Sequence, residues 1–237
     1  MNPSPPADDG AGPMPAWAAD GVRHHILLRA LRGQRHDVLG PLSAARMGLA
    51  TLKRRLAARP VDADAATELV AGLADQMVAA VAAVALMRVW DGPQTGTQPL
   101  QRLLPACADL LRTDASLRGH RLTVVQTPQE AVPGATDHAV ATPAAHYALL
   151  GWLMHHLDDC AQPANLALTL QAGALELRRA LRHQDGATPG PDPVLQPPTG
   201  DQPRSIDAGA LALLLRDLGW RQETLPDQRW RLHWPPA

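Results

Sequence analysis

A heptad repeat near the N-terminus constrains the fold more than any other feature of the sequence. Apolar residues recur there at alternating steps of four and three, in a segment (17–58) that contains no proline except Pro41. The repeating positions are Leu31, Val38, Leu42, Ala45, Leu49, Leu52 and Leu56. This period predicts a long helix whose apolar stripe packs against another helix.

A second helix is predicted after a short turn. The turn comprises residues 59–62, Asp62 or Asp64 can cap the helix that follows, and that helix runs to about Trp90. Its apolar stripe consists of Val70, Leu73, Met77, Val84 and Met87. Two long antiparallel helices with one apolar face each, and little else to cover it, predict a homodimer in which two hairpins form a four-helix bundle.

The rest of the chain predicts a second, mixed domain. Residues 91–97 have the composition of a linker. Helices are predicted over 100–117, 143–159 and 206–218, and strands over 121–126, 138–141, 165–170, 174–181, 220–223 and 229–234. This order favours an α/β sandwich with helices on one face of a sheet, so the whole chain is expected to be α+β.

Composition sets the domain limits that we expect. They are a disordered tail over 1–16, the helical hairpin over 17–91, and the α/β domain over 98–237 with a flexible loop over 185–204. The large side chains Trp220, Trp230 and Trp234 are expected to fill the core of the α/β domain.

Charge and cysteine content exclude several functions. The chain has 22 basic and 23 acidic residues and a net charge of −1, which gives no overall field for nucleic acid or an anionic membrane. Cys107 and Cys160 are too few and too far apart for a disulfide framework, which favours a reducing compartment. The longest strongly apolar stretch, 77–87, has 11 residues, about half of what a spanning helix needs. We therefore expect a cytoplasmic protein that binds neither nucleic acid nor membrane.

His36 is the best candidate for chemistry. It lies two residues before the repeat position Val38, so it should project from the outward side of the first helix. A neutral imidazole is a competent nucleophile, and the adjacent Asp37 can hold its second nitrogen. Arg32 and Arg35 add positive charge suited to a phosphoryl group or an acidic partner. An exposed His beside an Asp is more often an ordinary surface residue, so other features have to support this hypothesis.

The sequence around this histidine resembles a known motif. It reads Arg35-His36-Asp37-Val38-Leu39-Gly40-Pro41-Leu42. This is similar to the H-box of dimeric sensor histidine kinases, in which an acidic residue follows the phosphorylated His directly and a Pro comes five residues after it. The order of hairpin, linker, strands and helices also fits that family over nearly the whole chain after residue 20.

The resemblance implies an ATP-binding domain, but its nucleotide motifs are missing. In the corresponding helix, 149–157, the positions of two asparagines that hold Mg²⁺ and phosphates are taken by Trp152 and His156, neither of which suits Mg²⁺. Residues 182–186 lack the Asp-x-Gly-x-Gly order, and a single glycine, Gly209, remains where the family has a Gly-rich lid. We therefore expect a degenerate histidine-kinase-ATPase-like domain that binds no ATP.

This combination is similar to histidine phosphotransferases of the histidine-kinase-like type. Such proteins relay a phosphoryl group between aspartates of response-regulator receiver domains in two-component signalling, through a phosphohistidine. The resemblance implies that His36 is the nucleophile, that Asp37 is its polar neighbour, and that the receiver supplies Mg²⁺, so the chain needs no cofactor of its own. The expected partner-binding residues are Arg32, Arg35, Leu39, Gly40, Ser43 and Met47. Because many kinases have Thr or Asn where this chain has Gly40, phosphatase activity is not expected.

Two other functions stay open at this point. One is a non-catalytic scaffold or pseudokinase that binds a kinase or a receiver domain, and the other is a histidine kinase with a divergent nucleotide site. A separate group of potential metal ligands comprises His155, His156, Asp158, Asp159 and Cys160. No second pair with suitable spacing accompanies it, so a polar helix end is the preferred interpretation and no metal is expected.

Overall fold

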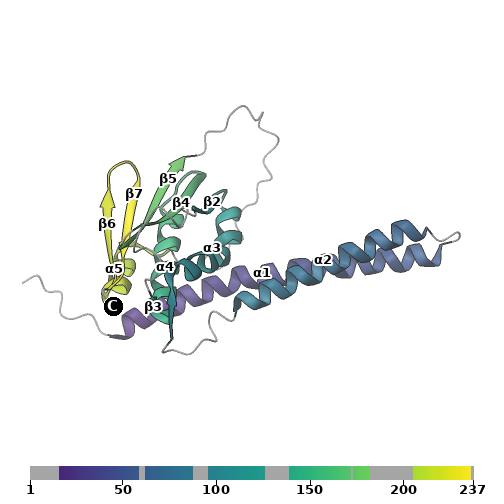
Figure 1. Ribbon diagram of the computed structural model, residues 1–237, viewed down its shortest axis with the longest axis horizontal. Helices are drawn as coiled ribbons and strands as arrows, with labels where there is room; N and C mark the ends of the chain where they lie inside the picture. Colours follow the sequence, from purple (N-terminus) through teal and green to yellow (C-terminus); the bar gives the residue numbers. More distant parts are fainter. Residues whose placement is uncertain are drawn as a thin grey trace, which may run out of the picture.

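A long helical hairpin projects from an α/β sandwich (Figure 1). The computed structural model describes residues 16–58, 62–87, 96–125, 139–171, 173–181 and 205–235. Helix α1 (Ala16–Ala57) and helix α2 (Ala63–Met87) run antiparallel and pack along each other. As expected, Asp62 caps α2, because its carboxylate accepts a hydrogen bond from the Ala65 amide at 3.0 Å.

Alanines, leucines and a glycine line much of the interior of the hairpin. Positions that are less exposed than their neighbours include Ala45, Gly48 and Leu52 on α1, and Leu69, Leu73, Ala80 and Ala83 on α2. A Cβ atom at Gly48 would lie 3.1 Å from Cδ2 of Leu73, so the two helices approach closely there. This contact also places the end of α2, at Met87, level with the part of α1 around Gln34, because the helices are antiparallel.

Half of the predicted apolar repeat lies at the edge of the hairpin rather than inside it. Leu42, Leu49, Leu56, Val70, Met77 and Val84 are between 41% and 53% exposed. Gly48 faces the other helix, and Leu49, the next residue, projects about 100° further around α1. The exposed apolar residues of α2 are displaced in the same sense from the residues that face α1. Because the two helices are antiparallel, the exposed apolar residues of both helices lie on the same side of the hairpin. The six residues therefore form one exposed apolar surface, called the hairpin face below.

The sandwich contains a mixed sheet. In the described part of the chain its strand order is β2-β4-β5-β7-β6, and β2–β4 is the parallel pair. The strands are β2 (Arg121–Val125), β4 (Ala164–Gln171), β5 (Ala174–Leu181), β6 (Arg221–Leu225) and β7 (Arg229–His233). Two short strands, β1 (Thr97–Pro99) and β3 (Ala139–Ala141), pair separately. The predicted elements occur in the predicted order, so the α+β class is confirmed, whereas the loop predicted over 185–204 lies outside the described residues.

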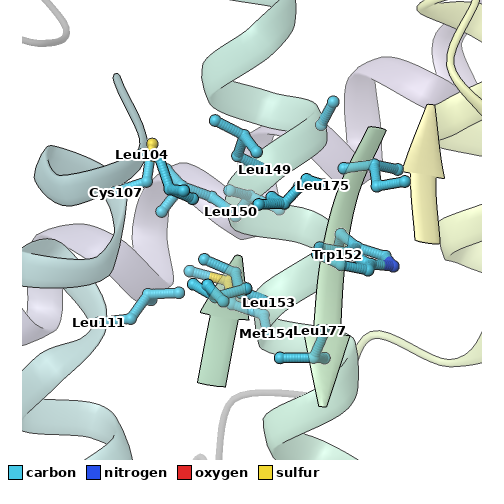
Figure 2. Close-up of a cluster of buried hydrophobic side chains, with 14 of the residues drawn as sticks. Leu104, Cys107, Leu111, Leu149, Leu150, Trp152, Leu153, Met154, Leu175 and Leu177 are labelled. Atoms are coloured by element: carbon cyan, nitrogen blue, oxygen red, sulfur yellow. The ribbon is translucent and has the colours of Figure 1, made fainter. Parts of the chain in front are cut away.

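Three helices cover one face of this sheet (Figure 1). They are α3 (Leu100–Leu117), α4 (Thr142–Asp158) and α5 (Ala208–Asp217). Figure 2 shows how leucines of α3 and α4 meet the inward side chains of the strands, with Trp152 among them. Full burial of each such side chain contributes roughly 1.5–3 kcal/mol. Trp220 is buried in this core and Trp230 and Trp234 pack against it, as the sequence predicts.

The N-terminal half of α1 belongs to the same core. It lies against α3, α4 and α5 on the side away from the sheet, and Ile26 and Ala30 are fully buried there. Gly151 of α4 makes this contact possible, because a Cβ atom at that position would come within 2.5 Å of Leu214 and 3.0 Å of Ile26. The expectation that the first helix has little to cover it apart from another hairpin is therefore wrong for its first half.

One described helix, α2, is long and apolar enough to cross a membrane by length and composition alone. The expectation that no segment reaches this length is therefore corrected. The reason is its alanine content, which extends the apolar stretch toward the N-terminal end of the helix. In the structure α2 pairs with α1.

Candidate functional site around His36

The imidazole of His36 stands on the outer side of the hairpin. His36 precedes Ala45, which faces α2, by about two and a half helical turns, so its side chain lies on the opposite side of α1. The side chain is 67% exposed, and its Nδ1 atom lies 3.5 Å from Oδ1 of Asp37. This separation is longer than a hydrogen bond but within the range of an ion pair. The expected exposure of His36 and its proximity to a carboxylate are both present.

The carboxylate of Asp37 is held from the other domain. Its Oδ1 atom accepts a hydrogen bond of 2.5 Å from the hydroxyl of Thr113, which lies on α3. The same oxygen therefore faces both Thr113 and His36. Sequence analysis did not identify Thr113, because nothing in a local pattern brings it next to a residue 76 positions earlier.

The predicted partner-binding residues surround the histidine on an open surface. Arg32, Arg35, Leu39, Gly40, Ser43 and Met47 are all exposed. Gly40, Ser43 and Met47 follow His36 at helical spacing, so they continue its side of α1. No atom lies within 4 Å of the place where a Cβ of Gly40 would be. Gly33, about one turn before His36, faces α3 of the same chain, because a Cβ atom there would lie 3.5 Å from the Leu110 carbonyl oxygen.

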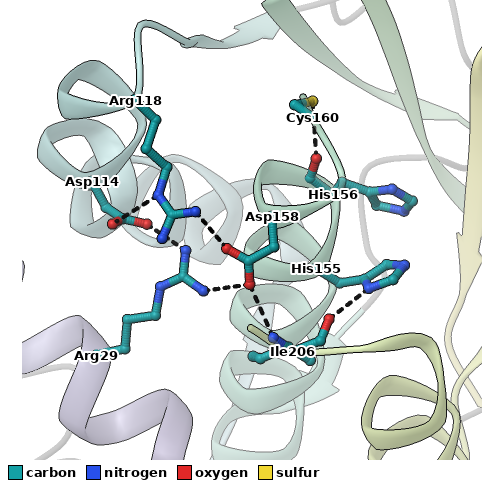
Figure 3. A network of polar contacts seen from close by, with 8 residues as sticks. All are labelled: Arg29, Asp114, Arg118, His155, His156, Asp158, Cys160 and Ile206. Carbon is teal, nitrogen blue, oxygen red and sulfur yellow. Dashed lines mark hydrogen bonds and ion pairs between the residues drawn. The ribbon is translucent and has the colours of Figure 1, made fainter. Parts of the chain in front are cut away.

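A buried ionic network fixes α1 to the sandwich beside this site (Figure 3). The guanidinium of Arg29, whose side chain is 2% exposed, donates to Asp114 at 2.6 Å and to Asp158 at 2.7 Å. Arg118 contacts the same two carboxylates, at 3.4 Å and 2.7 Å. Burial alone would lower the pKa of Arg29, but the two carboxylates outweigh it and raise that pKa. This role could not be predicted from a local pattern, in which Arg29 is only a basic residue between the apolar residues Ile26 and Ala30.

The residues of the potential metal set make separate contacts. Asp158 binds the two arginines and accepts a hydrogen bond from the Ile206 amide at 2.9 Å, and His155 Nδ1 lies 2.7 Å from the Ile206 carbonyl. Asp159 pairs with Arg179 at 3.1 Å, and Cys160 donates to the His156 carbonyl. Across the ranges that the structure describes, no three His, Cys, Asp or Glu side chains are grouped so that they could hold a metal ion.

The two residues that the sequence resemblance compares with nucleotide-binding asparagines, Trp152 and His156, are packed into the core. Trp152 donates from Nε1 to Oε1 of Gln222 at 2.6 Å, and His156 Nε2 lies 3.2 Å from the same oxygen. The His156 ring also packs on Trp230, with centroids 4.4 Å apart. Burial lowers the pKa of His156 to about 3, so the ring is neutral. Near the lid position, Asp207 caps α5 through the Ala210 amide, while residues 182–204 lie outside the described part of the chain.

Two solved structures are similar to this chain at low identity. A bacterial phosphotransferase, determined at 1.7 Å, has 14% identity and a TM-score of 0.43, with 92% of this chain and 96% of that chain covered. The histidine kinase AdeS of Acinetobacter baumannii has 10% identity and a TM-score of 0.32, covering 83% of this chain and 94% of that chain. No family model and no curated protein matches the sequence. Both TM-scores lie below 0.5, so the function is inferred below from the residues of this chain.

Proposed function

We propose that this chain is a histidine phosphotransferase. His36 takes a phosphoryl group from the phosphoaspartate of one receiver domain and gives it to the aspartate of another. The observation that carries the proposal is the exposed imidazole on a rigid helix, with a carboxylate 3.5 Å from its Nδ1 atom. Phosphoryl transfer depends mainly on positioning and on stabilising charge, so a fixed and accessible nucleophile is the main requirement.

The contacts of the ring indicate how the transfer proceeds. Because Nδ1 faces Asp37, Nδ1 keeps the ring proton and the lone pair of Nε2 is the nucleophile. Nε2 forms a bond to phosphorus, the bond between phosphorus and the aspartate oxygen breaks, and the receiver carboxylate leaves with the electron pair. The phosphorylated ring is then positively charged, and the Asp37 carboxylate stabilises it. The reverse steps transfer the phosphoryl group to the next receiver.

The second domain supports a function without ATP. Trp152 and His156 are buried and share a hydrogen-bond acceptor, Gln222. Residues in these positions would have to leave the core before they could face a nucleotide, and neither is a good Mg²⁺ ligand. In this proposal the phosphorylated receiver provides both the phosphoryl group and the Mg²⁺.

A homodimer completes the proposal. The hairpin face presents six large apolar side chains along two helices, and exposed apolar side chains that form one surface are typical of interaction sites. A second hairpin packed on this face gives a four-helix bundle. His36 points away from α2, so the surface around it stays open in such a bundle.

The test uses a phosphorylated receiver domain as the donor. We expect ³²P label to move to the wild-type chain, in a form that is stable to alkali and labile to acid, and His36→Ala to take up no label. His24→Ala is the matched control, because His24 is another exposed histidine on α1, and it should be labelled like the wild type. Label on His36→Ala would place the chemistry elsewhere.

The same experiment separates the rival functions. A receiver that binds the wild-type chain without transferring label would favour a scaffold and overturn the relay. Labelling of His36 from ATP in place of a receiver would favour a kinase.

A further inference from the structure

We propose that Thr113 is a positioning residue for the reaction at His36. This inference rests on the proposed function and assigns a role in it to the second domain. The hydroxyl of Thr113 holds the Asp37 carboxylate where it can accept the Nδ1 proton of His36. Thr113 thereby keeps Nε2 free to attack the phosphoryl group.

The contacts form a short chain across the two parts of the molecule. Thr113 Oγ donates to Oδ1 of Asp37 at 2.5 Å, and Oδ1 of Asp37 lies 3.5 Å from Nδ1 of His36. His36 and Asp37 are neighbours on α1, so their side chains leave the helix about 100° apart. The helix geometry alone does not hold the Asp37 carboxylate near the imidazole. The hydrogen bond from the Thr113 hydroxyl restricts the rotation of this carboxylate and orients it.

Thr113 is itself held firmly. A β-branched side chain in a helix has few rotamers, and here its hydroxyl bonds across to α1. The next residue, Asp114, forms the buried pair with Arg29 at 2.6 Å. One turn earlier, α3 lies against Gly33, where a Cβ would be 3.5 Å from the Leu110 carbonyl. These contacts on either side of Thr113 fix the distance between its hydroxyl and Asp37.

The tautomer of the imidazole is what this arrangement controls. A neutral imidazole has one protonated nitrogen, and a carboxylate that accepts the Nδ1 proton selects the form in which Nε2 has its lone pair. The same carboxylate stabilises the positive charge of the phosphorylated ring. The contribution of the second domain is therefore made through one hydroxyl group on α3, with no nucleotide involved.

The test compares Thr113→Val with Thr113→Ser in the full chain. Valine keeps the shape of threonine and removes the hydroxyl, whereas serine keeps the hydroxyl. For Thr113→Val we expect the rate constant of label transfer at saturating phosphorylated receiver to fall about 3- to 10-fold, with the half-saturating receiver concentration changed less than about twofold. Thr113→Ser should restore most of the rate. Thr123→Val, an exposed threonine on β2, is the control and should match the wild type.

A spectroscopic measurement follows the ring directly. In ¹⁵N spectra of the His36 imidazole, Thr113→Val should reduce the population protonated at Nδ1, and Thr113→Ser should not. If Thr113 acts through Asp37, Thr113→Val should have no further effect on rate or spectrum in an Asp37→Asn background. An unchanged rate and ring spectrum in Thr113→Val, with the wild type labelled normally, would overturn the inference. A wild-type chain that takes no label would instead refute the phosphotransferase, and the spectra would still decide whether Thr113 controls the ring.

Discussion

Replacement of Arg29 by methionine should destabilise the protein strongly. Methionine has a similar length and keeps most of the packing, but it removes the cation that lies between Asp114 and Asp158. Removing one partner of a buried ion pair typically costs about 3–5 kcal/mol, because the remaining charge is left buried. Arg118 still contacts Asp158 at 2.7 Å, and Asp114 is 23% exposed, so the lower end of that range, about 3 kcal/mol, is expected.

Urea unfolding followed by circular dichroism measures this cost. The control is Arg112→Met, because Arg112 forms an ion pair with Asp109 on the same helix but is 74% exposed, and exposed pairs contribute about 1 kcal/mol or less. Adding Asp158→Asn to Arg29→Met should recover part of the loss, because Arg118, the one guanidinium left in the network, then faces one carboxylate instead of two. If Arg29→Met costs no more than Arg112→Met, the network does not hold α1 to the sandwich.

Two further measurements test other parts of the structure. Burial lowers the pKa of His156 to about 3, whereas an imidazole in an unfolded chain titrates near 6.5, so the unfolded state binds the extra proton between these values. His156 therefore makes the free energy of unfolding fall by about 1.4 kcal/mol for each pH unit below about 6.5, down to about pH 3. Urea unfolding across that range should show this dependence on pH, and His156→Gln should reduce it. Equal slopes of unfolding free energy against pH for the wild type and His156→Gln would contradict the prediction. Met77→Glu, on the hairpin face, should give a monomer in sedimentation equilibrium, whereas Leu117→Glu, at an exposed position on α3, should leave a dimer; a wild-type monomer would refute the bundle.

The elements of the fold were accessible from local patterns. Alternation of apolar and polar residues is enough to place β4 and β5, and the spacing of apolar residues is enough to place α3. The exposure of His36 was also predictable, because its position follows from its distance to Val38 in the repeat. These features depend on residues that are close together in the sequence.

The inner side of the hairpin was not predictable from the same repeat. A seven-residue period predicts a broad apolar side of α1. It does not predict whether the row of residues that includes Gly48 or the neighbouring row that includes Leu49 packs against α2. In this molecule Gly48 allows the helices to approach closely at the inner stripe, so Leu49 is left at the edge. Both stripes are used only if a second hairpin is present.

The contacts that complete the site join residues far apart in the chain. Thr113 reaches Asp37, and Arg29 reaches Asp158, across 76 and 129 positions. No local pattern distinguishes these residues from ordinary surface threonines and arginines, because their roles depend on how α3 and α4 cross α1. The polar residues at the end of α4 are a similar case, because the sequence does not show which neighbour each of them contacts, and in the structure they contact different ones.

The continuity of α1 has a mechanical consequence. One uninterrupted helix, from Ala16 to Ala57, is built into the sandwich at one end and forms half of the hairpin at the other. A swinging motion of the sandwich toward His36 would require this rod to bend or to be pulled out of the core that holds Ile26. The histidine therefore keeps a fixed place relative to the sandwich, and in the proposed function the receiver domains would have to reach it by diffusion from solution.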